Sequence, residues 1–132
     1  MSNYKPQFKV KATYMRGGTS KGTFFNIADL PKEAQEDTKK RDKLLQRIVG
    51  SPDVYKQQMD GMGGATSSTS KAILVGRSSV PNHDVDYYFC QVAIDQDFVD
   101  MSGNCGNLSS AVGPFAIKEG LVDNVPQNGV CC

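Results

Sequence analysis

The sequence predicts a mixed fold of the α+β class, built from strand-forming and helix-forming segments in one chain of 132 residues. Two observations lead to this class. Short apolar runs that are typical of strands, alternating or continuous, occur at residues 8–14, 23–27, 72–75 and 84–94. Apolar side chains at helical spacing occur within residues 28–58 and 108–116. A chain of this length buries roughly two thirds of its unfolded surface, which suffices for one domain with its own core.

The first two predicted strands flank a segment rich in glycine, hydroxyl and cationic residues. Residues 8–14 alternate between apolar and polar side chains, which predicts a half-buried strand. Residues 16–22 follow, and the apolar run 23–27 forms the second strand, so we expect a hairpin with a long loop. The loop is either a flexible hairpin tip or a clamp for a carboxylate, because Arg16 offers a planar fork of donors and the hydroxyls add others.

Residues 28–58 have a helical character. Pro31 suits the first turn of a helix, and Thr38 is expected to cap a helical segment that ends at Gly50. Ser51 and Pro52 are expected to begin another short helix. The second and third strands are therefore predicted to be joined by a helical connection.

Residues 60–71 form a second segment of glycine and hydroxyl residues, which ends in Lys71 just before the apolar strand 72–75. The phosphate-binding pattern GxxxxGK[ST] is absent, and a strand rather than a helix follows. The composition alone would also suit a linker. The position between a helix and a strand favours a structured loop, in which a desolvated Lys71 could exchange a proton with a ligand.

Cys105 lies in the stretch MSGNCGN, residues 101–107, which follows the predicted strand 84–94. The apolar spacing that begins at Leu108 is helical and places Cys105 at or near a helix N-terminus. Unpaired N–H groups and the positive end of the helix dipole lower the pKa of a thiol in that position and attract a carboxylate. A lone cysteine is more often a buried structural residue, but the small polar neighbours here favour a reactive, proton-transferring cysteine.

The helix after Cys105 is expected to break near Ser110, because Pro114 cannot donate a backbone hydrogen bond to the preceding turn. Gly120 suits the end of this helix. Residues 128–129, Asn-Gly, suit a tight hairpin turn with a returning strand from Val130, so the sequence stops within a predicted hairpin.

The composition argues against several classes of protein. Fifteen Lys and Arg residues against fourteen Asp and Glu argue against a broad surface for nucleic acid or for an anionic membrane. No run approaches the roughly 18 apolar residues of a membrane span, and the polar N-terminus does not resemble a signal peptide. The four cysteines show neither disulfide-framework nor metal-site spacing, which indicates reduced thiols in a cytoplasmic protein without a metal.

Three motifs, taken in order along the chain, resemble the PrpF family of 2-methylaconitate isomerases, which act in propionate breakdown by the methylcitrate cycle. The motifs are YMRGGTSKG at residues 14–22, DGMGGATSSTSK at 60–71 and SGNCGN at 102–107. The Cys-Gly-Asn element also resembles the cysteine signature of diaminopimelate epimerases and proline racemases. The resemblance covers essentially the whole chain.

The resemblance implies a diaminopimelate epimerase-like fold of two lobes, each a curved, mostly antiparallel sheet or barrel around a central helix. The active site would lie between the lobes and would transfer protons without a cofactor. Residues 1–132 correspond to the N-terminal lobe, so we expect a fragment of a longer protein that lacks the second lobe.

The resemblance also implies roles for individual residues. Lys71 and Cys105 match the catalytic lysine and cysteine. The residues expected to bind substrate lie in all three motifs: Arg16, Thr19 and Ser20 in the first, Gly64 in the second, and Asn104, Gly106 and Asn107 in the third.

The expected function is therefore a cofactor-independent isomerase of a small unsaturated di- or tricarboxylate, with 2-methylaconitate as the expected substrate. A base, a partner acid and fixed donors for the developing charge are what allylic proton transfer needs. Two alternatives stay open: an epimerase or racemase, and a non-catalytic polycarboxylate-binding module that assists an aconitase-like dehydratase. A homodimer and a functional link to an aconitase-like 2-methylcitrate dehydratase are further expectations.

Overall fold

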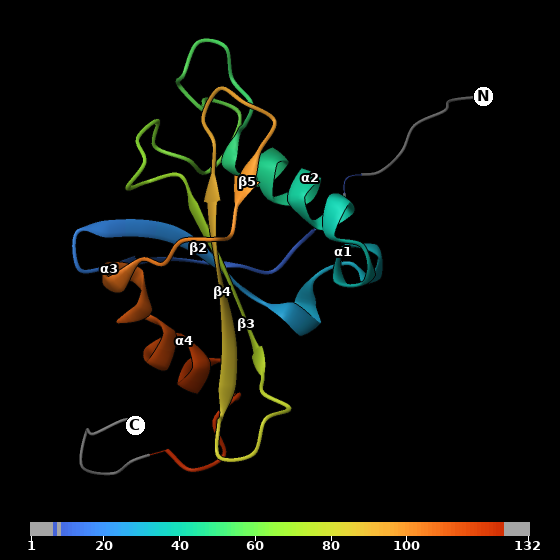
Figure 1. Cartoon of the computed structure of the whole chain (residues 1–132), viewed down its shortest axis with the longest axis vertical. Coiled ribbons are helices and arrows are strands. Elements are labelled where there is room, and N and C mark those ends of the chain that lie inside the picture. The colour runs from blue at the N-terminus through green and yellow to red at the C-terminus, as the bar shows by residue number, and fades with distance from the viewer. Residues whose placement is uncertain (1–6, 8, 126–132) are drawn as a thin grey trace.

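The computed structural model describes residues 7 and 9–125, which form a five-stranded sheet with helices on both faces (Figure 1). The strands lie in the sheet in the order in which they occur in the sequence. They are β1 (Thr13–Gly17), β2 (Ser20–Asn26), β3 (Lys71–Arg77), β4 (Val85–Val92) and β5 (Val99–Asp100). The mixed α+β class predicted from the sequence is confirmed.

β1 and β2, β3 and β4, and β4 and β5 pair antiparallel, whereas β2 and β3 pair parallel. A parallel pair needs a long connection that crosses back over the sheet. The helices between the two strands provide it: η1 (Ile27–Asp29), α1 (Lys32–Glu36) and α2 (Thr38–Val49). The parallel register places Gly22 of β2 opposite Lys71, the first residue of β3.

The hydrophobic core is divided into two clusters by the sheet. Phe24 of β2 belongs to the cluster under α3 (Gly106–Ser109) and α4 (Val112–Lys118), where its ring centroid lies 5.5 Å from that of Phe115. Phe25 belongs to the cluster on the opposite face, which includes residues of α1 and α2. Because successive strand residues point to opposite faces, one strand supplies both clusters.

The predicted first hairpin needs two corrections. Residues 9–12 are not in a strand, since β1 begins only at Thr13. The long loop predicted at residues 16–22 is also wrong, because Gly17 already pairs with Ser20 across a tight turn. Gly18 in that turn has a φ of +53°, a left-handed conformation that glycine adopts without strain. A glycine-rich stretch that looks like a loop by composition is here the end of a regular hairpin.

The N-cap of α2 is Asp37 rather than the predicted Thr38, which is the first helical residue. The Asp37 carboxylate accepts hydrogen bonds from the backbone N–H groups of Lys39 at 2.9 Å and Lys40 at 3.4 Å. These amides have no partner within the helix, so an acceptor one residue before the first turn satisfies them best.

Gly50 ends α2 in the left-handed conformation with a φ of +93°, as predicted. The helix expected to begin at residues 51–52 is not formed, because residues 51–58 adopt turns and bends. The side chain of Asp53 holds this segment by accepting hydrogen bonds from three backbone N–H groups, those of Tyr55, Gln57 and Gln58. An aspartate that binds nearby amides in this way competes with helix formation.

The second half of the chain follows the predictions more closely. β3 begins at Lys71, β4 lies within the predicted strand 84–94, and a break at Ser110 separates α3 from α4. Gly120 follows α4 with a φ of +70°. The hairpin predicted at residues 128–130 lies outside the described residues. No helix in the described part of the chain is long and apolar enough to cross a membrane.

Candidate active site

Cys105 lies where the coil after β5 enters α3, and it is the N-cap of that helix. Its Sγ accepts a hydrogen bond from the backbone N–H of Leu108 at 3.4 Å. The side chain is 9% exposed, so it is largely enclosed but still reachable from solvent. The predicted position of Cys105 at a helix N-terminus is confirmed.

Lys71 and Ser20 reach Cys105 from two neighbouring strands. The Nζ of Lys71 donates hydrogen bonds to Ser20 Oγ at 3.1 Å and to Cys105 Sγ at 3.4 Å. Ser20 Oγ lies 3.7 Å from Cys105 Sγ, and the serine is 2% exposed. The thiol donates to this hydroxyl, and once the thiol is deprotonated the hydroxyl can donate its own hydrogen to the sulfur. The three polar groups therefore form one connected cluster.

The pKa of Cys105 reflects a competition between burial and hydrogen bonding. Burial would raise the pKa of the thiol, but donors around the sulfur outweigh that effect and lower it below the ordinary value. These donors are the Leu108 N–H, the Ser20 hydroxyl and the Lys71 ammonium group, whose charge adds to its hydrogen bond. Since α3 has four residues, specific hydrogen bonds and the lysine charge, rather than the dipole of a long helix, favour the thiolate.

Cys90 of β4 has the opposite environment. It is 0% exposed and belongs to the cluster on the α1 and α2 face of the sheet. Burial raises the pKa of its thiol to about 12. The structure thus separates one activated thiol from one that stays protonated.

The hairpin tip contacts the start of α3. The Nδ2 of Asn107 donates a hydrogen bond to Thr19 Oγ1 at 3.0 Å, and both side chains belong to exposed residues. Gly106 is exposed, and a β-carbon added there would meet no atom within 4 Å. The backbone beside Cys105 therefore faces open space, as an approaching ligand would require.

The side-chain oxygen of Asn104 is engaged in hydrogen bonds with neighbouring residues of the protein. Its Oδ1 accepts hydrogen bonds from the backbone N–H of Cys105 at 2.9 Å and from the hydroxyl of Tyr87 at 2.5 Å. This amide therefore links the cysteine turn to β4.

Arg16 and Gly64 make their described hydrogen bonds within their own segments and not with the cysteine turn. The Nε of Arg16 donates to the Gly18 carbonyl at 2.7 Å, and strand alternation directs Arg16 away from the face that bears Ser20. Gly64 lies in the second loop, where its N–H donates to the Thr69 carbonyl at 3.1 Å. Their predicted roles in substrate binding stay predictions.

The second loop is fixed to the sheet and is not a linker. The Ser68 carbonyl accepts a hydrogen bond from the N–H of Lys21 at 3.0 Å. Gln91 of β4 donates through Nε2 to the carbonyls of Ser67 at 3.1 Å and Ser70 at 3.2 Å. These bonds define the position from which Lys71 starts β3.

Sequence reasoning missed the contribution of β4. Tyr87, Phe89 and Gln91 alternate along this strand, and each contacts a different part of the site. Tyr87 binds Asn104, the Phe89 ring lies beneath Lys71 with its centroid 5.8 Å from Nζ, and Gln91 binds the second loop. The sequence shows the alternation of these side chains along β4. It does not show that β4 pairs with β3, which brings them beside Lys71.

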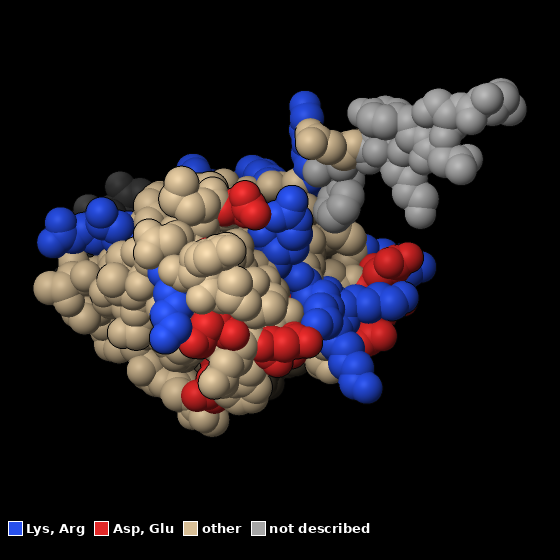
Figure 2. All heavy atoms as spheres, turned by 90° about the horizontal axis from the view of Figure 1, so that it is seen from above, with Lys and Arg blue, Asp and Glu red and all other residues tan. Residues whose placement is uncertain are grey.

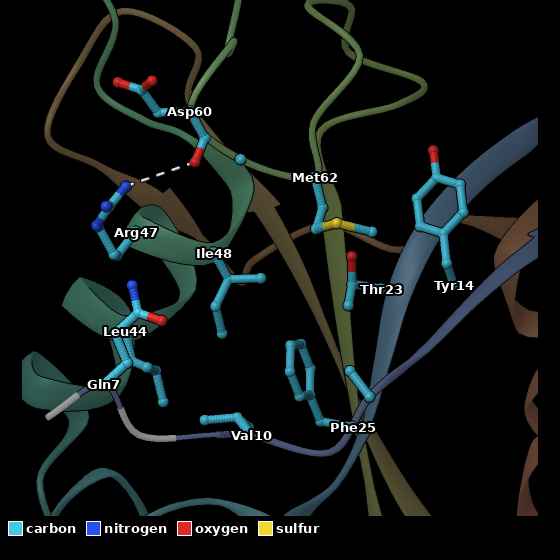
Figure 3. A pocket seen from close by; sticks show the side chains of 12 residues that line it. Gln7, Val10, Tyr14, Thr23, Phe25, Leu44, Arg47, Ile48, Asp60 and Met62 are labelled. Carbon is cyan, nitrogen blue, oxygen red and sulfur yellow. Dashed lines mark hydrogen bonds between the residues drawn. The ribbon is translucent and has the colours of Figure 1, made fainter.

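A cavity of about 640 Å³ lies on the other side of the sheet (Figure 3). It is open to solvent and is lined by the segment before β1, by β1 and β2, by α2 and by the start of the second loop. Its lining residues are Gln7, Val10, Ala12, Tyr14, Thr23, Phe25, Leu44, Arg47, Ile48, Asp60, Gly61 and Met62. None of the predicted site residues lines it.

Charged side chains of both signs are interspersed on the face shown in Figure 2. Ion pairs in the described part of the chain join different elements, such as Lys43 of α2 with Asp97 at 2.6 Å. Most such pairs are solvent-exposed and contribute little to stability. The charged group that acts on the thiol of Cys105 is the ammonium group of Lys71.

The fold and the site together define an α+β protein that holds a thiol beside an ammonium group at the N-terminal end of its central strand. A model of the PrpF protein family matches residues 7–131. The chain belongs to the PrpF family.

Known relatives agree with this assignment. The chain is 63% identical to a 2-methyl-aconitate isomerase of Shewanella oneidensis, over 99% of this chain and 34% of the relative. It is 64% identical to a 2-methyl-aconitate isomerase of Cupriavidus necator, over 95% of this chain and 32% of the relative. The chain thus spans about a third of the length of these relatives.

The fold is also similar to a solved structure. The crystal structure of a methylitaconate-delta-isomerase superposes with a TM-score of 0.79 at 50% sequence identity. The match covers 88% of this chain and 28% of that one.

Proposed function

We propose that this chain is the N-terminal lobe of a two-lobed, cofactor-independent isomerase that acts on a small unsaturated polycarboxylate. 2-Methylaconitate is the proposed substrate. The family assignment and the names of the two bacterial relatives support the reaction class and the substrate. The separation of 3.4 Å between Lys71 Nζ and Cys105 Sγ is the structural observation on which the proposal rests.

Cys105 is the proposed base. A thiolate in this position removes a proton from the carbon next to the double bond, and the electron pair moves into the conjugated carboxylate system. The Lys71 ammonium group returns a proton at the other end of the allylic anion and is then reprotonated by the Cys105 thiol 3.4 Å away, so the double bond has moved and no atoms are gained or lost. Lys71 stabilises the negative charge on the carboxylate and on the sulfur. Such acid–base groups typically contribute about 10²–10⁴-fold to the rate.

The start of α3 and the hairpin tip form the proposed carboxylate site. Thr19 Oγ1 accepts a hydrogen bond from Asn107, so the threonine keeps its own O–H to donate to a ligand. Asn107 keeps a second N–H on the same amide nitrogen. The open space at Gly106 allows the carboxylate to approach both donors.

The proposed lobe has a diaminopimelate epimerase-like fold, with α3 and α4 as its central helix and the curved sheet around it. The relatives are about three times as long as this chain, which agrees with a second lobe in a protein of that length. That lobe would cover the exposed side of Cys105 and exclude water from the reaction.

The test is proton exchange, measured by NMR on the protein of natural length with 2-methylaconitate in D₂O. We expect interconversion of the double-bond isomers, with deuterium entering at the allylic carbons. Cys105→Ala should abolish both, whereas Cys90→Ala is the matched control and should retain both. Binding without isomerisation or exchange would overturn the proposal in favour of a polycarboxylate-binding module. Undiminished exchange by Cys105→Ala would overturn the assignment of the base.

A further inference from the structure

The hydroxyl of Tyr87 on β4 reaches the residue that precedes the candidate base. It donates a hydrogen bond to Asn104 Oδ1 at 2.5 Å, and the same oxygen accepts the backbone N–H of Cys105 at 2.9 Å. One side-chain oxygen therefore joins a strand residue to the backbone of Cys105. Oxygen of an amide has two lone pairs, and both are used here.

The strand register determines which residues of β4 face the site. Tyr87 pairs with Val75 and Phe89 pairs with Ile73, and both partners belong to the core cluster under α3 and α4. Tyr87 packs against the same cluster, so its ring is held on the face of the sheet that bears Lys71. The position of the hydroxyl is therefore fixed by a strand and by the packing of the ring against the core.

The turn before α3 has a second anchor at its other end. The carboxylate of Asp100 accepts hydrogen bonds from the N–H of Ser102 at 2.8 Å and from its hydroxyl at 2.6 Å. Gly103 lies between the two anchors and faces the Phe89 ring. Beyond Ser102 and apart from the bonds of the Cys105 sulfur itself, the described side-chain bond that ties this turn to the sheet is the one from Tyr87 to Asn104.

We propose that Tyr87 is a positioning residue, whose hydrogen bond to Asn104 holds Cys105 Sγ within reach of Lys71 and of the Leu108 N–H. Its effect on catalysis rests on the proposed function, whereas its effect on the thiol does not. The groups that surround the sulfur are Lys71 from β3, Ser20 from β2 and the Leu108 amide from α3. Displacing the turn would move the sulfur away from all three.

A second consequence concerns Asn104. Because both lone pairs of its Oδ1 are occupied, Asn104 offers a substrate only the donors of its NH₂ group. It can therefore bind a carboxylate oxygen but not a ligand hydroxyl or ammonium group that must donate. Tyr87 in this way fixes the orientation of the amide as well as the position of the turn.

The experiment compares Tyr87→Phe with Tyr88→Phe in the protein of natural length. Tyr88 is the next residue of β4, is 45% exposed, and its hydroxyl makes no hydrogen bond within the described residues, so it is a matched control. The readout is the alkylation rate of Cys105 as a function of pH, resolved by mass spectrometry of the cysteine peptides. Steady-state isomerisation of 2-methylaconitate is measured alongside.

Tyr87→Phe should lower the alkylation rate of Cys105 at pH 7 about two- to tenfold, the factor expected for one hydrogen bond. Its rate profile should move to higher pH, because the thiolate loses donors. kcat should fall by a similar factor, because a smaller fraction of Cys105 is then present as the thiolate. Tyr88→Phe should match the wild type in every measurement.

An unchanged alkylation profile in Tyr87→Phe would overturn the proposal. If Tyr87→Phe does not fold, Asn104→Ala removes the acceptor from the exposed turn and should give the same shift; an unshifted profile there would also overturn it. The double variant should be no worse than Asn104→Ala alone, because both changes remove the same link. Failure of the proposed function would appear separately, as a Cys105→Ala protein that still isomerises.

Discussion

The backbone of Gly17 in β1 lies directly against the backbone of Asn107 and Leu108 in α3. A β-carbon at residue 17 would overlap the Asn107 carbonyl oxygen and lie 3.0 Å from the Leu108 Cα. The hairpin and the helix that bears the candidate base can therefore meet only because residue 17 has no side chain. This contact sets how deeply α3 sits over the start of β2, where Ser20 lies.

Gly17→Ala should consequently separate α3 from the hairpin. We expect a loss of about 1–3 kcal/mol in the free energy of unfolding, as for other overpacked sites, together with slower alkylation of Cys105. Urea denaturation measures the first effect. Gly106→Ala is the matched control, because its new β-carbon meets nothing within 4 Å, and it should not lower stability. Equal stability of the two variants would contradict the close contact.

The two described cysteines should differ strongly in reactivity. At pH 7 we expect iodoacetamide to label Cys105 much faster than Cys90, because only the first has a lowered pKa and the second is buried with a pKa of about 12. The pH at which the rate for Cys105 is half-maximal should lie below that of an ordinary thiol, about 8.5. A polycarboxylate should protect Cys105. In urea the two thiols should react alike, and a native protein that also labels them alike would contradict the structure.

Substitutions of Lys71 should distinguish the effect of its positive charge from its role as a proton donor. Lys71→Ala should lower kcat about 10²–10⁴-fold and slow the alkylation of Cys105, because the thiolate loses its cationic partner. Lys71→Arg should restore much of the thiol reactivity but little of kcat, since a guanidinium group cannot release its proton at neutral pH. If Lys71→Arg keeps nearly full kcat, the lysine serves only as a charge.

Ser20 is buried and bonded to both Lys71 and Cys105, so its substitution should affect rate rather than binding. Ser20→Ala should raise the barrier by about 1.5–3 kcal/mol, the value of a hydrogen bond to a charged group, with KM nearly unchanged. Thr19→Ala, one residue away at the exposed tip, should instead raise KM. A rise in KM for Ser20→Ala at constant kcat would show that Ser20 binds the substrate directly.

The loop after α2 should be sensitive to acid through Asp53. Hydrogen bonds from the backbone N–H groups of Tyr55, Gln57 and Gln58 lower the pKa of this carboxyl group. A lowered folded-state pKa means that the stabilisation is present above the unfolded value, about 3.9, and is lost as the pH falls through the folded value. Amide exchange at Gln57 and Gln58, corrected for intrinsic rates, should stay slow at pH 5 and accelerate only in stronger acid. Asp53→Asn should weaken this protection at neutral pH, and equal protection in the variant would contradict the role of the carboxylate.

The position of Cys105 was predictable because its determinants are local. Small polar residues followed by helical apolar spacing from Leu108 indicate an N-cap, and the structure confirms it. The proximity of Lys71 was not predictable from spacing, since the two residues are 34 positions apart and meet only through the parallel pairing of β2 and β3. The resemblance of three motifs to a known family is what placed Lys71 and Cys105 in one predicted site.

The errors have local causes as well. Composition cannot distinguish a glycine-rich loop from two strands that meet at Gly18, because the same residues serve both. The cap at Asp37 was missed because an acceptor was sought at Thr38, one position too late. Tyr87 was missed because its partner, Asn104, is identified by the packing of α3 on the sheet and by no feature of the strand itself.

Two of the three groups that lower the pKa of Cys105, Lys71 and Ser20, lie 34 and 85 positions away from it in the chain. Contacts of such long separation form late in folding, after the local hairpins and helices. A nascent or unfolded chain therefore presents Cys105 as an ordinary, mostly protonated thiol. Oxidants and electrophiles in the cell would meet a reactive sulfur only in molecules that have completed their folding.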